Sequence, residues 1–259
     1  MVDVRPTLEA VLFDAGGTLV RIDYEWVSEM LAELGVEASV EQVRRSEVRG
    51  RRLYDAAATR PRRLAEGEAH PTLGSVAPVE AYWSGMLEAA GCRHPLLEEA
   101  IDRMSEKQRP PSLLWGRPLE GSREAIAGVL GLGLRAACVS NSDGRAEHHL
   151  VTCDVRDGLE FVVDSQIVGI EKPDPRIFGI ALERMGISAE RALYVGDIRS
   201  VDEAGALAAG MSVVILDPFG DYVPEDRRSI RDISLLPEYL ERHFATPGGA
   251  NGPASVRSS

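Results

Sequence analysis

Short apolar runs alternate with longer helical stretches through most of this 259-residue chain. Each run is followed by a turn and then by a helical stretch, which is typical of a parallel α/β sheet. The pattern predicts strands at residues 8–13, 134–139, 192–196 and 212–216, with a weaker strand at 160–163. It predicts helices at residues 121–132, 144–152, 174–185 and 199–209. Binding sites in such sheets lie beyond the carboxyl ends of the strands.

A long insert between the first two predicted strands shows no strand-like alternation and is rich in Ala, Leu, Glu and Arg. It predicts helices at residues 24–34, 39–58, 78–90 and 95–106. The chain therefore divides into a core, a helical cap and a tail: residues 1–20 and 112–245, residues 21–111, and residues 246–259. The tail has few apolar residues and is predicted to be disordered.

The net charge and composition of the chain limit the kinds of binding partner that we expect. A net charge of −12 argues against nucleic acid and acidic membranes, which are bound through clustered Lys and Arg. Cys92, Cys138 and Cys153 are widely spaced, which predicts neither a disulfide framework nor a zinc site. No apolar run is long enough to span a membrane. We expect a cytoplasmic protein that binds a small anionic substrate locally.

Asp14 is the candidate nucleophile, because it ends the first predicted strand and precedes two glycines. A carboxylate can attack phosphorus or an activated carbon, form an ester and then be released by water. Gly16 and Gly17 would let backbone amides face an incoming anion. An aspartate in an ordinary turn at a strand end is the alternative.

Asp197 and Asp202 follow a later predicted strand in the spacing Gly-Asp-x-x-x-x-Asp. This spacing places one carboxylate at the strand end and the next one turn into a helix. Asp14, Asp197, Asp202 and the backbone carbonyl of Gly16 are the oxygen ligands that Mg²⁺ prefers. A helix cap is the alternative for Asp197, and an exposed helix position is the alternative for Asp202.

Four motifs in this order resemble the haloacid dehalogenase (HAD) superfamily: 11-VLFDAGGTL-19, 139-VSNSDG-144, 171-EKPDP-175 and 195-VGDIRSVD-202. The resemblance implies a Rossmann-like parallel sheet core with a helical C1-type cap inserted after the first strand. It also implies Mg²⁺ as cofactor, an aspartyl covalent intermediate and hydrolysis of a small phosphorylated metabolite.

The resemblance also implies roles for the residues of this chain that match the family motifs. Asp14, Ser140 and Lys172 are the expected catalytic residues, with the Lys172 ammonium neutralising both the nucleophile and the phosphate. The expected substrate-binding residues are Gly17, Thr18, Asn141 and Ser142. The alternative for Ser140 is a helix N-cap.

One position departs from the phosphatase pattern. Phosphatases of the family carry a second Asp two residues after the nucleophile, as acid and base, and Gly16 stands there in this chain. General acid–base catalysis of this kind raises the reaction rate by about 10²–10⁴-fold. Two alternatives to a phosphatase therefore stay open: a catalytically weakened binding protein, and a metal-independent 2-haloacid dehalogenase.

The cap has its own pattern. Eight arginines cluster in it, namely Arg44, Arg45, Arg49, Arg51, Arg52, Arg60, Arg62 and Arg63. On a helix, Arg45, Arg49 and Arg52 would share one face. They would either meet an anionic substrate group or be solvated or paired with Glu41, Glu47 and Asp55. Five aromatic residues are predicted to form the cap core: Tyr24, Trp26, Tyr54, Tyr82 and Trp83. His148 and His149 are expected in surface or core positions of a helix, with a role as substitute acid as the alternative.

Overall fold

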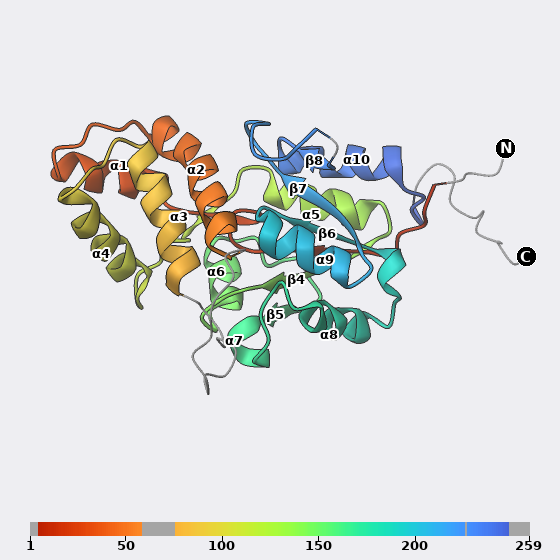
Figure 1. The fold of residues 1–259 in the computed structure, drawn as a ribbon. Coiled ribbons are helices and arrows are strands. Elements are labelled where there is room, and N and C mark those ends of the chain that lie inside the picture. Colours follow the sequence, from red (N-terminus) through yellow and green to blue (C-terminus); the bar gives the residue numbers. More distant parts are fainter. Residues whose placement is uncertain (1–4, 59–75, 226, 249–259) are drawn as a thin grey trace, which may run out of the picture.

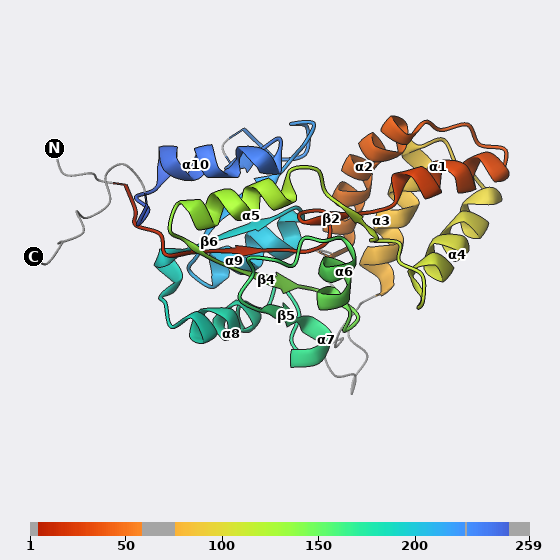
Figure 2. The ribbon, with the colours of Figure 1, turned by 180° about the vertical axis from the view of Figure 1, so that it is seen from behind.

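The fold is a six-stranded sheet flanked by helices, with a second group of helices at one end (Figures 1 and 2). The structure is a computed structural model, and it describes residues 5–58, 76–225 and 227–248. The strand order is β5-β4-β1-β6-β7-β8, and every neighbouring pair is parallel. The predicted Rossmann-like α/β architecture is thereby confirmed.

The sheet strands follow the predicted apolar runs closely. Their bounds are β1 Ala10–Phe13, β4 Arg135–Ser140, β5 Val162–Asp164, β6 Ala192–Gly196, β7 Ser212–Leu216 and β8 Ser229–Ile230. The last of these was not predicted from the sequence, because two residues are too few to show a periodic pattern. β1 lies between β4 and β6, so Asp14 emerges at the middle of the sheet.

Alternate residues of β1 pack on opposite faces of the sheet, as the pleat requires. Val11 and Phe13 join a buried cluster under two helices, α5 Ser122–Gly131 and α10 Leu236–His243. Ala10 and Leu12 join a second cluster on the other face, under α8 Pro175–Met185 and α9 Ala204–Ala208. The apolar run of β1 is therefore buried on both sides, as in a three-layer α/β fold.

Four core helices lie close to the positions predicted at 121–132, 144–152, 174–185 and 199–209, whereas the short helix after β5 and the last helix of the chain were not predicted. Their bounds are α5 Ser122–Gly131, α6 Ala146–Thr152, α7 Ser165–Val168, α8 Pro175–Met185, α9 Ala204–Ala208 and α10 Leu236–His243. Short 3-10 turns cover Ala189–Arg191 and Ile233–Leu235. The helix predicted at 199–209 begins as a π-helical segment, Arg199–Glu203, before α9.

The described part of the insert forms four helices with an apolar core of their own. They are α1 Tyr24–Glu33, α2 Val40–Ala58, α3 Val76–Ala89 and α4 Leu96–Gln108. Figure 1 shows all four beside one end of the sheet. The chain leaves and re-enters the core through a small antiparallel pair, β2 Val20–Arg21 and β3 Arg117–Pro118. The division into core and cap at residues 21 and 111 stays a prediction.

Helices α2 and α3 approach closely at two glycines. A Cβ atom on Gly50 would lie 2.8 Å from the Tyr82 carbonyl oxygen, and one on Gly85 would lie 3.0 Å from the Arg49 carbonyl oxygen. A side chain at either position would press on the backbone of the facing helix, so glycine sets the spacing of the pair. This close packing sets the position of the two helices relative to each other.

The predicted disordered tail needs a correction at its start. Thr246 is buried, and the Gly248 amide donates a hydrogen bond to the Leu132 carbonyl at 2.7 Å. Backbone pairing therefore holds these residues on the core despite their polar composition. Residues 249–259 lie outside the described part. Among the described residues, the helices are all too short or too polar to cross a bilayer.

Candidate active site

Asp14 lies at the carboxyl end of β1 and is buried. Its backbone N–H donates to the Val195 carbonyl, which keeps β1 beside β6. Its Oδ1 accepts a hydrogen bond from the Ala15 amide at 2.7 Å. The carboxylate is therefore fixed at the sheet edge.

The loop after Asp14 is tightly folded. The Leu19 and Val20 amides both donate to the Ala15 carbonyl, and Gly17 adopts a φ of 74°. A Cβ atom on Gly17 would lie 2.2 Å from Asp197 Oδ2, so the Asp197 carboxylate rests directly on the loop backbone. Glycine is required there both for the left-handed conformation and for this approach.

Lys172 links the motifs. Its Nζ lies 2.9 Å from Asp14 Oδ1 and donates to Asp202 Oδ1 at 2.7 Å. It also donates to the Tyr194 hydroxyl at 2.8 Å, and that hydroxyl donates to the Val139 carbonyl. These three oxygens match the three N–H bonds of the ammonium. The buried cation is thus held in one position.

The turn after Lys172 explains how the chain places it. Asp174 caps α8 by accepting a hydrogen bond from the Arg176 amide, and Pro175 occupies the first helical turn. Proline suits this position because its missing N–H would have no partner there anyway. The Asn141 side chain accepts from the Lys172 amide at 2.7 Å and donates to the Lys172 carbonyl at 2.9 Å.

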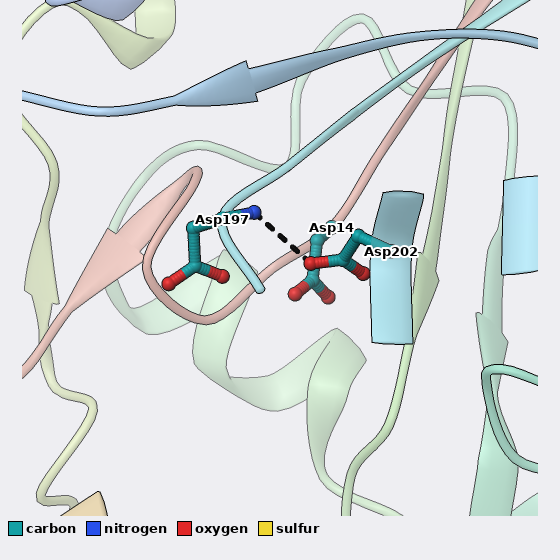
Figure 3. Close-up of side chains that lie close together, drawn as sticks. All are labelled: Asp14, Asp197 and Asp202. Carbon is teal, nitrogen blue, oxygen red and sulfur yellow. Dashed lines mark hydrogen bonds between the residues drawn. The ribbon is translucent and has the colours of Figure 1, made fainter. Parts of the chain in front are cut away.

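Asp14, Asp197 and Asp202 form one buried cluster (Figure 3). One ligand oxygen from each lies within 4.8 Å of the others. Asp202 Oδ2 accepts hydrogen bonds from the amides of Asp197 and Ile198, at 3.0 and 2.9 Å. The spacing predicted for a metal site therefore brings all three predicted carboxylates together.

Burial dominates the electrostatics of these groups. It raises the pKa of Asp14 to about 6, although Lys172 acts in the opposite direction. It also raises the pKa of Asp197 well above its ordinary value, although Arg51 opposes this. Burial disfavours the charged form of Lys172, but Asp14 and Asp202 outweigh that effect and raise its pKa.

The cap contributes a second buried cation. Arg51 of α2 places Nε 3.1 Å from Asp197 Oδ2 and donates to the Leu216 carbonyl. The Nε–H is not aligned for a hydrogen bond, so the contact with Asp197 is an ion pair. On its other side, Glu47 lies 3.7 Å away and accepts hydrogen bonds from the Tyr24 and Tyr82 hydroxyls.

The donor set fits a hard divalent cation. Four buried carboxylates, those of Asp14, Asp197, Asp202 and Glu47, face two buried cations, Lys172 and Arg51. The resulting excess of negative charge is what a divalent ion would balance, and carboxylate oxygens are the ligands that Mg²⁺ prefers. Burial is the largest cause of the raised pKa values of Asp14 and Asp197, and the nearby Asp202 carboxylate adds to both.

Some of the other predicted site residues line the cavity beside this cluster, and others do not. Gly16, Ser140, Asn141 and Ser142 line the same cavity as Asp14. Thr18 is fully buried, and its hydroxyl has no hydrogen-bond partner among the described residues. Neither Thr18 nor Gly17 is among the residues that line the cavity, but the Asp197 carboxylate packs against the backbone of Gly17.

The cavity has a volume of about 620 Å³ and lies between the sheet edge and the cap. That size suits a small-molecule site. Trp115 covers Gly16: a Cβ atom on this glycine would lie 3.5 Å from the indole ring. The side chain that a phosphatase would place here therefore meets an aromatic ring rather than open solvent.

The cap arginines divide into two groups. Arg45 pairs with Asp221 and Arg49 with Glu88, while Arg52 donates to the Asp221 carbonyl. These three are exposed and do not line the cavity, and their partners differ from the predicted Glu41, Glu47 and Asp55. Arg60, Arg62 and Arg63 lie outside the described residues. Arg51, off the predicted face, is the arginine that reaches the site.

The predicted aromatic residues do form the cap core, together with others. Tyr54, Tyr82 and Trp83 also line the cavity, which the sequence did not predict. His149 is buried and lines the cavity too. Burial and Arg145 lower its pKa, so its imidazole is neutral at pH 7 and is a poor substitute acid.

The sequence missed three contacts: Arg51 with Asp197, Tyr194 with Lys172, and Trp115 with Gly16. The four-residue spacing of Glu47 and Arg51 was one signal, because it predicts a pair on one helix face. Tyr194 was the single polar side chain in the run of β6. Trp115 gave no signal, because it lies in an irregular segment.

Comparison with known proteins agrees with this geometry. Residues 8–210 match the family model of haloacid dehalogenase-like hydrolases. The chain is 42% identical over 93 residues to the haloacid dehalogenase-like hydrolase domain-containing protein 3 of Mus musculus, covering 36% of this chain and 37% of that protein. It is 33% identical over 133 residues to the glyceraldehyde 3-phosphate phosphatase of Methanothermobacter thermautotrophicus, covering 48% and 59%.

These matches span less than two thirds of the length of either relative. Among solved structures, the crystal structure of a dehalogenase with an intermediate complex aligns with a TM-score of 0.61 and 20% identity. The alignment covers 95% of this chain and 99% of the other, and at this identity it shows the fold alone. The family model spans most of the chain, so the protein belongs to the haloacid dehalogenase-like hydrolases.

Proposed function

We propose that the protein is a Mg²⁺-dependent phosphohydrolase that acts on a small phosphorylated molecule through an aspartyl-phosphate intermediate. The buried cluster of Asp14, Asp197, Asp202 and Lys172 carries this proposal. It joins a nucleophile, a fixed cation and a set of oxygen ligands at one sheet edge. The phosphatase named among the relatives supports the same reaction class.

The geometry supports the following assignment of steps to residues within this proposal. Asp14 Oδ1 accepts from Ala15 and faces Lys172, so Oδ2 is the oxygen that we expect to attack phosphorus. Ser140 and Asn141 line the cavity beside it and would bind the phosphoryl oxygens. Asp14, Asp197, Asp202 and the Gly16 carbonyl would hold Mg²⁺, which supplies positive charge to a phosphoryl group when bound.

Lys172 has a separate part in this scheme. Its three N–H bonds already meet Asp14, Asp202 and Tyr194, so it holds the nucleophile in place before substrate arrives. A fixed cation needs no reorganisation when charge develops on the phosphoryl group. This preorganisation supports transfer to Asp14 rather than direct attack by water.

The test is phosphate release from small phosphate esters and acyl phosphates, with Mg²⁺ and with EDTA. We expect turnover that needs Mg²⁺ and that Asp14→Asn abolishes. Asp154→Asn is a matched control, because Asp154 is exposed and pairs with Arg123 far from the cluster. Halide release from a 2-haloacid in EDTA would instead establish the dehalogenase reaction.

Gly16 supports a second candidate, a binding protein with weakened catalysis. No carboxyl group stands at this position to protonate a leaving group, and Trp115 lies against it. This candidate predicts that orthovanadate with Mg²⁺ raises the melting temperature while no ester in the panel releases phosphate. Gly16→Asp would then test whether a restored acid gives turnover.

A further inference from the structure

The cap side of the cavity is an aromatic wall. We use this name for Tyr54 of α2, Tyr82 and Trp83 of α3, and Trp115 of the segment that returns to the core. Pro78 and Val79 extend the wall at the start of α3. Among the described lining residues between positions 54 and 115, the charged types are absent, and Gln108 is the polar exception.

The rings of the wall are held in place. The Tyr82 hydroxyl donates to Glu47, and the Tyr82 and Trp115 ring centroids lie 6.4 Å apart at 36°. Tyr82 and Trp83 are buried, while Tyr54 and Trp115 are half-buried and expose part of their surface to the cavity. A fixed aromatic surface binds a flat apolar group without losing much side-chain freedom.

The opposite side of the cavity is polar. Asp14, Ser140, Asn141 and Lys172 lie there. A substrate that spans the cavity therefore places its phosphoryl group on the sheet edge and its leaving group against the aromatic wall. Among the described cap residues, Arg51 is the cation that contacts the cluster, and it is buried between Asp197 and Glu47 and does not line the cavity.

Gly16, which Trp115 covers, further limits which kinds of leaving group can depart. Without a carboxylic acid at position 16, the leaving oxygen departs unprotonated unless another acid serves it. His149 lines the cavity, but its imidazole is neutral. Slow departure of a basic alkoxide is the consequence, whereas a phenol, with a pKa of about 10, leaves far more readily.

We propose that the aromatic wall binds the leaving group and that the substrate class is an aryl phosphate monoester; this inference rests on the proposed phosphohydrolase function. An Asp14 oxygen forms a bond to phosphorus while the bond from phosphorus to the aryl oxygen breaks. The aryloxide leaves with that electron pair and takes a proton from water. A water molecule then attacks the aspartyl phosphate, which restores the carboxylate, and its lost proton balances the proton taken by the aryloxide.

Binding of phenylphosphonate tests the wall without any turnover. Two of the three tryptophans, Trp83 and Trp115, line the cavity, so their fluorescence should change on titration with Mg²⁺ present. We expect phenylphosphonate to bind about threefold to tenfold more tightly than cyclohexylphosphonate, because only the flat ring stacks. Trp26→Phe is the control, since Trp26 lies in α1 outside the cavity. Equal affinities, or a signal lost in that control, would overturn the inference.

Turnover tests the substrate class. Tyr54→Leu should lower kcat/KM for phenyl phosphate by about tenfold more than it lowers kcat/KM for acetyl phosphate, because acetyl phosphate has no ring to stack. Tyr54→Phe should match the wild type if the ring, and not the hydroxyl, is what acts. Asp14-dependent hydrolysis of acetyl phosphate without preference for phenyl over cyclohexyl phosphate would overturn the inference and leave the proposed function standing. Failure to hydrolyse any of these esters, with phenylphosphonate still bound, would overturn the proposed function and the substrate class together.

Discussion

Two buried cations face the same carboxylate cluster, and they come from different parts of the fold. Lys172 belongs to the core, follows a tight turn and has three oxygen partners within 2.9 Å. Arg51 belongs to cap helix α2 and has longer contacts, at 3.1 Å to Asp197 and 3.7 Å to Glu47. Both side chains are almost fully buried.

The position of Lys172 depends on contacts within the core alone, whereas the position of Arg51 depends on the packing of α2. Lys172 is bonded to residues of its own domain, so it stays with Asp14 whatever the cap does. Arg51 stays at Asp197 only while α2 lies against the core. Asp55 of the same helix also holds the core, because it accepts hydrogen bonds from the Ser200 amide and the Tyr222 hydroxyl. The core thus fixes the nucleophile through its own contacts, whereas the position of the Arg51 cation depends on how α2 packs against the core.

The largest effect is expected from Lys172→Met, which removes the fixed cation. Asp14 and Asp202 would then be buried without their partner, and turnover should fall by about 10²–10³-fold. The free energy of unfolding should fall by about 3–5 kcal/mol. Steady-state kinetics and urea unfolding measure the two effects. Activity within threefold of the wild type would contradict a fixed role for Lys172.

Arg51→Met should have the next largest effect. In EDTA it should lower the free energy of unfolding by about 3 kcal/mol, because Asp197 and Glu47 lose their cation. Added Mg²⁺ should stabilise this variant more than the wild type, since a divalent ion beside Asp197 replaces the lost charge. The matched control is Arg52→Met, an exposed neighbour on the same helix, with an expected effect within about 0.5 kcal/mol. Equal Mg²⁺ responses in the variant and the wild type would show that Arg51 and the metal do not share a role.

Asp14→Asn should raise stability in a pH-dependent way. Burial raises the pKa of Asp14 to about 6, so ionising it in the folded state lowers the stability of the wild type. That loss grows as pH rises from about 4 to 6 and is complete above 6, whereas the Asn variant never ionises. In EDTA the variant should be more stable by about 2 kcal/mol at pH 7.5, and the difference should vanish near pH 4. Urea unfolding across pH measures it, and a difference that grows toward pH 4 would contradict the sign.

Tyr194→Phe should have the smallest effect. It removes the hydroxyl that accepts from Lys172 and donates to Val139, but the ring keeps its edge-on contact with Phe178 at 4.9 Å. We expect a loss of about 1 kcal/mol in stability and a fall of a few fold in kcat with KM unchanged. A change in KM alone would place Tyr194 in substrate binding rather than in positioning Lys172.

The residues that could be predicted from the sequence share one property. Asp14, Ser140 and Asp197 each lie at the end of an apolar run, so the parallel sheet alone brings them to one edge. Lys172 was found through its motif in a turn. For these residues, local sequence and strand order together predict the position, and the roles assigned to them stay predictions.

Contacts between the cap and the core could not be predicted in this way. Helical periodicity grouped Arg45, Arg49 and Arg52, but it carries no information on which face of α2 meets the core. That choice depends on packing between segments far apart in the chain, as in the pairing of Arg51 with Asp197. The position of Trp115 over Gly16 depends on an irregular segment, which has no period to read.

The two glycines between α2 and α3 have a consequence for how this protein could acquire new substrates. Arg51 stands next to Gly50, and Tyr82 lies directly across from it. An alanine at Gly50 would push the helices apart and so shift the arginine and the aromatic ring together, although position 50 does not touch the cavity. Substrate range could therefore change through the spacing of one helix pair while every side chain of the site keeps its identity.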